Sequence, residues 1–382
     1  MLHRLHLHQF RNYRDQVFVP DPAVTVVTGE NGSGKTSLLE AIYLLGAGRS
    51  FRTARLGSVV MSECDHCTLF AEIGSDQGPR RVGIQRDRQN LVDARLDGSR
   101  ISGLSDIARL FPVQVLHPGT VELVEGGSGA RRRYLDWAMF HVEHDFIEEW
   151  RRLRVALEQR NRLLKKGSLN RRELAVWDRQ LGESSARIDA LRRRHLPRLA
   201  ALFEEELQAF ADAVPAVSLS LHSGWAAGED IHQVLAETLE QDLRRGFTGK
   251  GAHRADLLLG STEGSVREVF SRGQQKIVAY ALIMAQVRLI RELAGRDCLM
   301  LVDDLTSELD QDNVGRVLAA VVRVARQVII TSLDPALAPL GRETDYTVFH
   351  VEHGTLKAGE KHQGRQDSGQ PEPNDLQARE TP

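Results

Sequence analysis

The chain begins with alternating apolar and polar positions. Leu5 and Leu7 would face one way and the histidines beside them the other, which is the pattern of a strand. A second apolar run, residues 24–27, leads into a glycine-rich turn. After this turn, residues 36–45 are mainly apolar. We expect a helix there that ends at Gly46.

Short runs of β-type residues alternate with turns in the next part of the chain. The runs 67–74, 80–87 and 91–98 are typical of antiparallel strands that follow one another. The last of them ends in Asp97-Gly98, a dipeptide that favours a two-residue hairpin turn. This region therefore predicts an antiparallel meander.

A helical pattern replaces the β pattern near residue 130. Apolar residues recur at helical spacing over 146–164, where Arg160 interrupts the series, and again over 174–191. Gly167-Ser168 would form the turn between them. At about 1.5 Å per residue, each helix would span on the order of 30 Å. We therefore expect a short helical hairpin rather than a long coiled coil.

The α/β pattern returns at about residue 255, with strands expected at 299–304 and 327–332 and a long helix before each. The last 24 residues hold two hydrophobic side chains and predict a disordered tail. The chain is therefore expected to be an α/β protein whose head is interrupted by a helical second domain. The expected divisions are residues 1–130 and 251–358 for the two halves of the head, 131–250 for the helical insert and 359–382 for the tail.

Charge changes this picture in one place. Lys and Arg number 50 and Asp and Glu 52, so the formal net charge of −2 excludes a uniformly basic nucleic-acid binder. Residues 151–200, however, hold 15 basic and 5 acidic side chains, a net of +10, which leaves −12 for the rest of the chain. The helical insert is thus a basic lobe on an acidic body. Two interpretations stay open: a solvated helix surface and a surface that faces nucleic acid.

The composition also indicates where the protein works. No segment reaches the roughly 18 unbroken apolar residues of a membrane helix, and the first residues lack the apolar core of a signal peptide. Three cysteines cannot build a disulfide framework, which indicates a reducing compartment. We expect a cytoplasmic protein with no membrane partner.

A phosphate-binding loop stands between the second expected strand and the first expected helix, and it fits the pattern G-x-x-x-x-G-K-[ST]. The glycines let backbone N–H groups curve around phosphate oxygens, and the helix points its positive end at the same anion. The lysine supplies a charge for the β- and γ-phosphates, and the threonine hydroxyl helps to hold Mg²⁺. The motif therefore predicts binding of ATP with Mg²⁺. Its residues are Gly29, Glu30, Asn31, Gly32, Ser33, Gly34, Lys35 and Thr36.

Two carboxylates supply the metal ligand that such a loop needs. The apolar run 298–302 ends in Asp303 and Asp304, as expected of a buried strand that delivers acids to its carboxyl edge. Asp303 would hold Mg²⁺, and Asp304 could polarise the attacking water. Because Lys35 and Asp303 lie 268 positions apart in the chain, the two motifs require a large insertion between two halves of one head.

A further anion site is predicted at the start of the long helix before this strand. Ser271 and Gly273 form a Ser-x-Gly turn at the helix N-terminus. Taken alone, this turn is also consistent with an ordinary helix cap. In this position it resembles the signature motif of the ATP-binding cassette class, and residues 307–310 resemble the D-loop of that class. The resemblance implies that Ser271 and Gly273 serve the γ-phosphate on a partner's loop across a homodimer.

The motifs in this order resemble those of the RecF family, bacterial recombination-mediator ATPases that are small relatives of the SMC and Rad50 proteins. The resemblance runs from about residue 1 to 355. Besides the motifs above, it is carried by the segments 10–13, 48–52, 131–137 and 251–256.

This resemblance implies an ABC-type P-loop head with an inserted helical second domain. It also implies an ATP-driven homodimer, slow DNA-stimulated ATP hydrolysis, and binding to single-stranded and gapped DNA. Family members act with RecR and RecO to help load RecA, supporting DNA replication, recombinational repair and the SOS response. Carried over residue by residue, the resemblance implies that the catalytic positions are Lys35, Asp303 and Asp304 and that the metal ligands are Thr36 and Asp303. The implied nucleotide contacts are Gly29 to Thr36, Arg11, Asn12, Ser271 and Gly273. Gln114 is a candidate for the Q-loop role.

Two departures from the cassette pattern indicate a slow enzyme that uses ATP as a dimerisation clamp. Asp304 stands where many cassette ATPases have Glu, and Thr331-Ser332 stand at the position of a switch histidine. Two other functions remain open: the energising subunit of a transporter, which would share the head motifs, and a scaffold that binds ATP without turnover. The basic insert argues against the transporter subunit.

Overall fold

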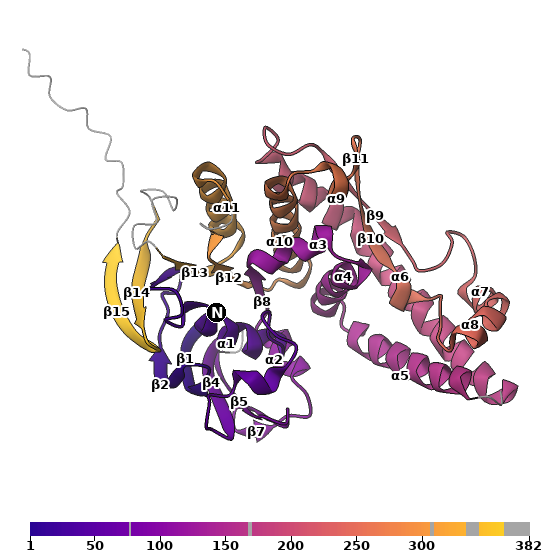
Figure 1. Ribbon diagram of the computed structural model, residues 1–382, viewed down its shortest axis with the longest axis horizontal. Coiled ribbons are helices and arrows are strands. Elements are labelled where there is room, and N and C mark those ends of the chain that lie inside the picture. The colour runs from indigo at the N-terminus through magenta and orange to yellow at the C-terminus, as the bar shows by residue number, and fades with distance from the viewer. Residues whose placement is uncertain (76–77, 167–169, 306–308, 334–343, 363–382) are drawn as a thin grey trace, which may run out of the picture.

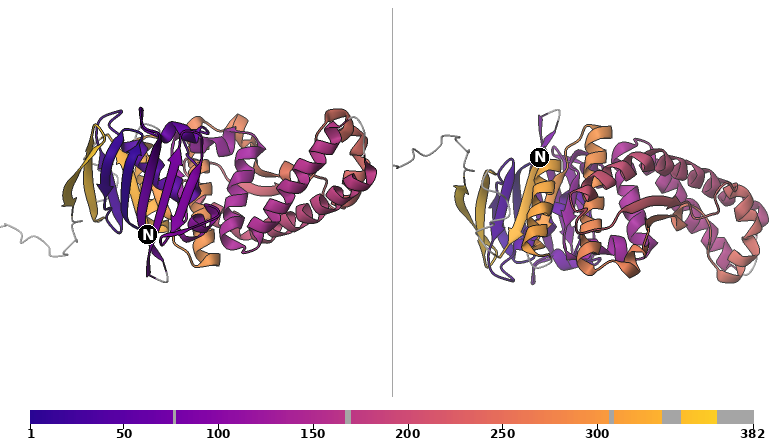
Figure 2. Two further views of the ribbon diagram at one scale, coloured as in Figure 1. Left: turned by 90° about the horizontal axis from the view of Figure 1, so that it is seen from below. Right: turned by 90° about the horizontal axis from the view of Figure 1, so that it is seen from above.

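The computed structural model describes residues 1–75, 78–166, 170–305, 309–333 and 344–362. Figures 1 and 2 show two parts: a head that holds two large β-sheets, and an elongated arm of helices that extends from it. The turn expected at Gly167-Ser168 lies outside the described residues, as do Ser307 and Glu308 of the expected D-loop.

An antiparallel six-stranded sheet forms one layer of the head, in the order β2-β1-β4-β5-β6-β7. Leu5 and Leu7 on β1 are fully buried, which confirms the alternation read from the sequence. The hairpin turn at Asp97 and Gly98 is also confirmed, with φ of 51° and 84°. The bounds are β1 Leu2–Phe10, β2 Tyr13–Phe18, β4 His66–Ser75, β5 Gly78–Asp87, β6 Val92–Leu96 and β7 Ser99–Arg100.

A mostly parallel six-stranded sheet forms the second layer, in the order β15-β14-β3-β13-β12-β8. Strands β3, β12 and β13 are buried along their whole length, as expected of strands covered on both faces. Helix α1 packs between the two sheets, whereas α10 and α11 cover the opposite face. The bounds are β3 Val24–Thr28, β8 Val113–Leu116, β12 Leu299–Asp303, β13 Gln327–Ser332, β14 Tyr346–Glu352, β15 Thr355–His362, α1 Lys35–Ala47, α2 Ser105–Leu110, α10 Arg272–Ala294 and α11 Gln311–Val324.

Helix α1 does not end at Gly46, as the sequence predicted, but continues to Ala47 and is capped by Gly48 at φ 67°. Gly46 serves close packing instead. A Cβ atom there would lie 2.4 Å from Cγ2 of Val113 and 2.7 Å from the carbonyl oxygen of Phe111. The absence of a side chain therefore lets α1 approach the chain entering β8.

The arm consists of helices α4 to α8 and a three-stranded sheet in the order β11-β10-β9. Because β9 pairs with β10, residues 256–265 belong to the arm's sheet, and the division expected between 250 and 251 cuts through it. The bounds are α3 Glu122–Glu125, α4 Ser128–Val142, α5 Phe146–Lys165, α6 Arg171–Gln208, β9 Val217–His222, α7 Ile231–Glu237, α8 Leu239–Arg245, β10 Asp256–Ser261, β11 Gly264–Ser265 and α9 Val266–Val269, with 3-10 helices at Leu56–Val59, Pro118–Val121 and Ala252–Arg254.

Helix α6 is longer than the sequence predicted. Its 38 residues span roughly 57 Å, about twice the 30 Å expected, whereas α5 with 20 residues matches the expectation. The helix runs through Pro197, although a proline inside a helix costs about 3 kcal/mol. Beyond it, Leu199, Leu202 and Phe203 are buried, and burying each such side chain stabilises by about 1.5–3 kcal/mol. This burial offsets the cost of the proline.

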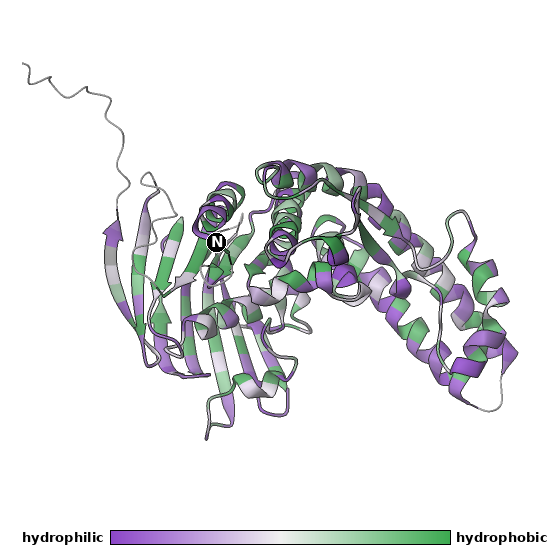
Figure 3. Cartoon of the chain, turned by 45° about the horizontal axis from the view of Figure 1, so that its top comes forward, coloured by the Kyte–Doolittle hydropathy of each residue, from purple (hydrophilic) through white to green (hydrophobic). Residues whose placement is uncertain are grey.

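Arg160 does not interrupt the apolar seam of α5 but lies within it, fully buried. Its Nε donates to Asp178 on α6 at 2.6 Å, and its Nη1 donates to Asp242 on α8 at 2.7 Å and to Thr248 at 2.8 Å. The expected break in the seam is wrong because neighbouring elements supply carboxylates for the guanidinium group. Along these helices Figure 3 shows hydrophilic and hydrophobic positions interleaved.

The tail expected at 359–382 is wrong for its first four residues, and its remaining part, residues 363–382, lies outside the described residues. Residues 359–362 belong to β15, which pairs with β14 in a register that joins Tyr346 to His362. Pairing with a strand that is itself in the head's sheet orders these residues despite their polar composition. In the described part of the chain, no helix is both long and apolar enough to cross a bilayer.

Candidate functional site

The loop between β3 and α1 has a backbone that only glycine fits at two positions. Gly29 and Gly34 have φ of 149° and 128°. A Cβ atom on Gly29 would lie 2.3 Å from the carbonyl oxygen of Val351, and one on Gly34 would lie 2.8 Å from Nδ2 of Asn12. The loop therefore curves tightly over the N-terminus of α1, where backbone N–H groups bind anions.

The turn between β1 and β2 supports this loop. Asn12 Nδ2 donates to the carbonyl oxygen of Ser33 at 2.7 Å, and the Tyr13 hydroxyl donates to that of Gly34 at 3.0 Å. The backbone N–H of Gly354 reaches the Ser33 carbonyl oxygen as well, at 2.9 Å. The sequence placed Asn12 near the nucleotide, and the structure shows that it also fixes the loop's shape.

Lys35 lies within the loop. Its Nζ donates to the carbonyl oxygens of Gly29 at 2.6 Å and of Glu30 at 2.9 Å. Burial lowers the pKa of its ammonium group, and the nearby carboxylates of Asp304 and Asp303 oppose that shift. The charge is thus held at the position where a phosphate group would meet the loop.

The acidic end of β12 meets the loop, as the motifs required. Asp303 Oδ1 accepts hydrogen bonds from Thr36 Oγ1 at 3.0 Å and from Thr331 Oγ1 at 2.8 Å. Burial raises the pKa of Asp303, although both hydroxyl donors act to lower it. Asp304 follows at a positive φ of 50°, and its N–H donates to Thr331 Oγ1 at 3.1 Å. Thr331 on β13 therefore orients both acidic residues.

These oxygen donors fit Mg²⁺. Thr36 and Asp303 present a hydroxyl and a carboxylate oxygen 3.0 Å apart, and hard oxygen ligands are what Mg²⁺ prefers. A buried carboxylate with a raised pKa is also stabilised by a divalent cation.

Glu40 is a further candidate site residue, and the sequence motifs do not mark it. It lies one turn after Thr36 on α1 and is fully buried. Arg11 donates to it through Nε at 2.9 Å and Nη2 at 2.7 Å, Ser50 through Oγ at 2.5 Å, and Arg52 through Nη1 at 3.3 Å. An acid inside an apolar helical run was the signal that could have marked it.

Most of the expected nucleotide contacts line a cavity of about 480 Å³, which we call the nucleotide cavity. Arg52, Ser58, Val60 and Ser62 also line it, and the sequence analysis did not name them as site residues. Gly29 and Ser33 are not among its lining residues and shape the loop instead. The predicted residues that line it are Arg11, Asn12, Glu30, Asn31, Gly32, Gly34, Lys35, Thr36, Asp303 and Asp304.

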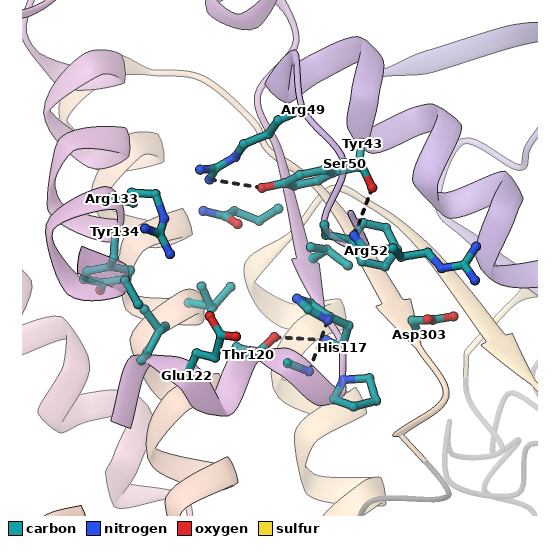
Figure 4. Close-up of a pocket in the computed structure, with 18 of the residues that line it drawn as sticks. Tyr43, Arg49, Ser50, Arg52, His117, Thr120, Glu122, Arg133, Tyr134 and Asp303 are labelled. Carbon is teal, nitrogen blue, oxygen red and sulfur yellow. Dashed lines mark hydrogen bonds between the residues drawn. The ribbon is translucent and has the colours of Figure 1, made fainter. Parts of the chain in front are cut away.

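A second cavity, of about 560 Å³, lies beside the first and shares Thr36, Arg52 and Asp303 with it (Figure 4). Gln114 lines this second cavity, not the nucleotide cavity. Its Nε2 donates to Oε1 of Gln286 at 2.5 Å, which holds its side chain toward α10.

Ser271 and Gly273 do not join the nucleotide cavity of their own chain. Ser271 caps α10: its Oγ accepts from the N–H of Gln274 at 3.3 Å, and its own N–H donates to Oε1 of Gln274 at 2.9 Å. Ser271 is exposed at the helix end, where a partner molecule can reach it.

Many of the arm's arginines form ion pairs with acidic residues of the arm itself. Arg192 pairs with Asp136 at 2.6 Å and Arg187 with Glu149 at 2.7 Å. Arginines 152, 193, 194 and 198 also have acidic partners in the arm. Exposed cations remain near the far end of the arm, where α5 ends and α6 begins; they are Arg162, Lys165, Lys166, Arg171 and Arg172.

Comparison with known families finds one match over most of the chain. The model of the RecF/RecN/SMC N-terminal domain matches residues 1–357. A Stutzerimonas stutzeri protein named DNA replication and repair protein RecF is 40% identical over 358 residues, which cover 93% of this chain and 96% of that protein. A Pseudomonas putida protein of the same name is 39% identical over 365 residues, covering 94% and 99%.

Solved structures share the fold. A structure of the recombination mediator protein RecF with ATP, from the RecFOR pathway, has a TM-score of 0.82 at 22% identity and covers 94% of this chain and 97% of that one. The Smc head domain of Pyrococcus furiosus has a TM-score of 0.57 at 16% identity, covering 93% and 95%. The expected ABC-type head with a helical second domain is thus confirmed.

Proposed function

The chain belongs to the RecF family of SMC-like ATPases, and from that premise we propose that it binds ATP with Mg²⁺ and acts on DNA in replication and recombinational repair. Its relatives are named DNA replication and repair protein RecF, and the similarity covers nearly their whole length. Within this proposal, residues 1–130 and most of 251–358 supply the head, and 131–250 together with the strands of 256–265 supply the arm.

One contact carries the proposal: the hydrogen bond between Thr36 on the loop and Asp303 at the end of β12. It joins the phosphate-binding half of the site to the acidic half across most of the chain. Thr36 and Asp303 would hold Mg²⁺, and Lys35 and the loop's N–H groups would bind the phosphates. Bound Mg²⁺ would neutralise phosphate charge, while Asp304 would orient the attacking water.

Two copies of the chain would share each ATP. Ser271 and Gly273 lie outside the nucleotide cavity of their own chain, and Ser271 is exposed. A hydroxyl and a helix N-terminus suit the γ-phosphate of a partner's ATP. ATP would then hold the dimer together, and hydrolysis would release it.

The chemistry at this site would be slow. Asp304 is held in a left-handed backbone conformation by Thr331, and no histidine stands at the Thr331-Ser332 position. Its carboxylate is also one methylene shorter than that of Glu. These features support the use of ATP as a switch rather than as a source of rapid turnover.

DNA, single-stranded or gapped, would be the ligand of the ATP-bound dimer, and the cytoplasm its location. The exposed cations near the far end of the arm offer phosphate contacts. RecR and RecO would act with it, and RecA indirectly, as the family resemblance implies.

The test compares wild type with Lys35→Arg, which keeps the charge but alters its geometry. Wild type should hydrolyse ATP slowly, with turnover raised by single-stranded DNA, and should bind DNA in the ATP form. Lys35→Arg should lose ATP-dependent DNA binding. Unchanged binding in the variant would contradict the proposal, and no turnover in wild type, with or without DNA, would favour a scaffold.

A further inference from the structure

The second cavity opens beside the place where the terminal phosphate of ATP would lie. It meets the nucleotide cavity at Thr36, Arg52 and Asp303, the residues that frame the predicted metal site. Asp303 is buried and Thr36 is half-buried at this end of the cavity, whereas Arg52 is exposed there.

Arginines dominate the outer part of this cavity. In Figure 4, Arg49 and Arg133 lie on the side away from Asp303. The charged residues that line the whole cavity are Arg49, Arg52, Arg133, Glu122 and Asp303. Arg49 donates only to the neutral Tyr43 hydroxyl, at 3.3 Å, and within the described residues Arg133 has no ion pair or hydrogen bond. Two guanidinium groups are therefore available to an anion.

The cavity suits a small tetrahedral anion. Guanidinium groups bind phosphate through paired N–H donors, and about 560 Å³ leaves room for such an ion with its water. Thr120, Tyr134 and Trp137 add polar and aromatic surface. Ala130 on α4 forms part of the wall, so a larger side chain there would narrow the passage.

We propose that this cavity is the exit route and transient binding site for inorganic phosphate formed by ATP hydrolysis. The inference rests on the proposed function. Hydrolysis consumes one water, breaks the bond between the γ-phosphorus and the bridging oxygen, and yields ADP, inorganic phosphate and a proton. In the proposed dimer the partner's Ser271 closes the γ-phosphate side of the nucleotide cavity, so phosphate leaves past Asp303 and Arg52 toward Arg49 and Arg133.

The first experiment needs no turnover of ATP. Binding of inorganic phosphate to the ADP-loaded protein is followed by phosphorus NMR. The variant Arg49→Gln/Arg133→Gln should bind phosphate at least about tenfold more weakly, because two charge-assisted contacts are lost. Arg179→Gln, an exposed arginine on the arm, is the matched control and should bind as wild type does. Equal phosphate binding in all three proteins would overturn the proposal.

The second experiment follows a single turnover of ATP. Quenched-flow analysis reports cleavage of ATP, and a phosphate-binding reporter protein reports phosphate that has reached solution. Ala130→Phe should delay release of phosphate after cleavage without slowing cleavage itself. Simultaneous cleavage and release in this variant would overturn the exit route. So would loss of DNA binding with unchanged phosphate binding in the arginine variant, which would assign the cavity to nucleic acid.

Together, the two experiments distinguish a failure of the phosphate site from a failure of the proposed function. Absence of ATP cleavage in wild type would contradict the proposed enzyme but would leave the equilibrium binding of phosphate measurable. Weakened phosphate binding in Arg49→Gln/Arg133→Gln supports the site in either case. Melting temperatures of the variants, compared with wild type, distinguish a lost site from a misfolded protein.

Discussion

Glu40 in the head and Arg160 in the arm are both fully buried among partners of opposite charge, and the two groups differ in their surroundings. In the head, buried Glu40 binds Arg11 and Arg52, which are themselves partly exposed and line the nucleotide cavity. In the arm, buried Arg160 binds Asp242, which is also fully buried, together with Asp178. The same pair of chemical groups therefore orients side chains toward a ligand in one region and joins helices in the other.

The comparison separates two uses of buried charge. A buried carboxylate that holds exposed arginines gives those arginines a fixed direction at a binding surface. A fully enclosed pair gives specificity of packing, and losing one partner leaves the other charge without compensation. Substitutions of Arg160 and of Glu40 test this distinction.

The largest effect is expected from Arg160→Leu. The substitution leaves Asp242 buried without its cation, which should lower the free energy of unfolding by about 3–5 kcal/mol. Urea unfolding measures the change. ATP affinity should stay the same, because the arm's ion pair lies away from the nucleotide cavity.

Arg187→Leu is the control, since Arg187 is an exposed arginine on the same arm that pairs with Glu149. It should move the urea midpoint little. Equal midpoints for Arg160→Leu and the control would show that the Arg160 pair does not hold the arm together.

A smaller effect, on ligand binding, is expected from Glu40→Gln. The neutral amide keeps the size of the side chain but removes the charge that holds Arg11 and Arg52, so ATP should bind about tenfold more weakly. Titration with a fluorescent ATP analogue measures the affinity. Ser50→Ala, which removes a neutral partner of the same carboxylate, should weaken binding less. A Glu40→Gln protein that is less stable but binds ATP normally would reduce Glu40 to a packing role.

The smallest effect is expected from acid. Burial lowers the pKa of His253 to about 4, below the value of about 6.5 for an unfolded histidine. The folded protein therefore favours the neutral ring: this contribution to stability is complete above pH 6.5 and is lost as the pH falls toward 4. The slope is at most about 1.4 kcal/mol per pH unit.

His253 Nε2 lies 3.2 Å from the carbonyl oxygen of Thr248, whose hydroxyl accepts from Arg160. His253→Asn retains an N–H donor but cannot titrate. Urea unfolding between pH 7 and 5 should show a flatter pH dependence in the variant. Parallel curves for the two proteins would exclude His253 from the acid response.

The sequence predicted local features better than contacts between distant segments. The phosphate-binding loop and the acidic strand end carry their chemistry in adjacent residues, so the Thr36–Asp303 meeting followed from the motifs. The contact between Glu40 and Arg52 could not be predicted from the sequence, because it depends on a turn and a helix that meet only in the fold. Thr331 was read only as a missing histidine, yet its hydroxyl holds Asp303.

The errors in the arm and at the C-terminus have a common cause. Arg160 was read as a break because the sequence does not show that Asp178 and Asp242 will face it. The apolar pattern over 174–191 predicts a helix about half as long as α6, because the burial of Leu199, Leu202 and Phe203 that carries α6 past Pro197 depends on other elements. In both cases tertiary partners reversed a local preference.

In the proposed dimer, each ATP is bound by two copies of the chain. Light scattering with ATP and Mg²⁺, and again with ADP, measures the molar mass most directly. We expect twice 42.7 kDa with ATP, 42.7 kDa with ADP, and 42.7 kDa in both states for Ser271→Arg. A mass of 42.7 kDa for wild type with ATP demonstrably bound would contradict it.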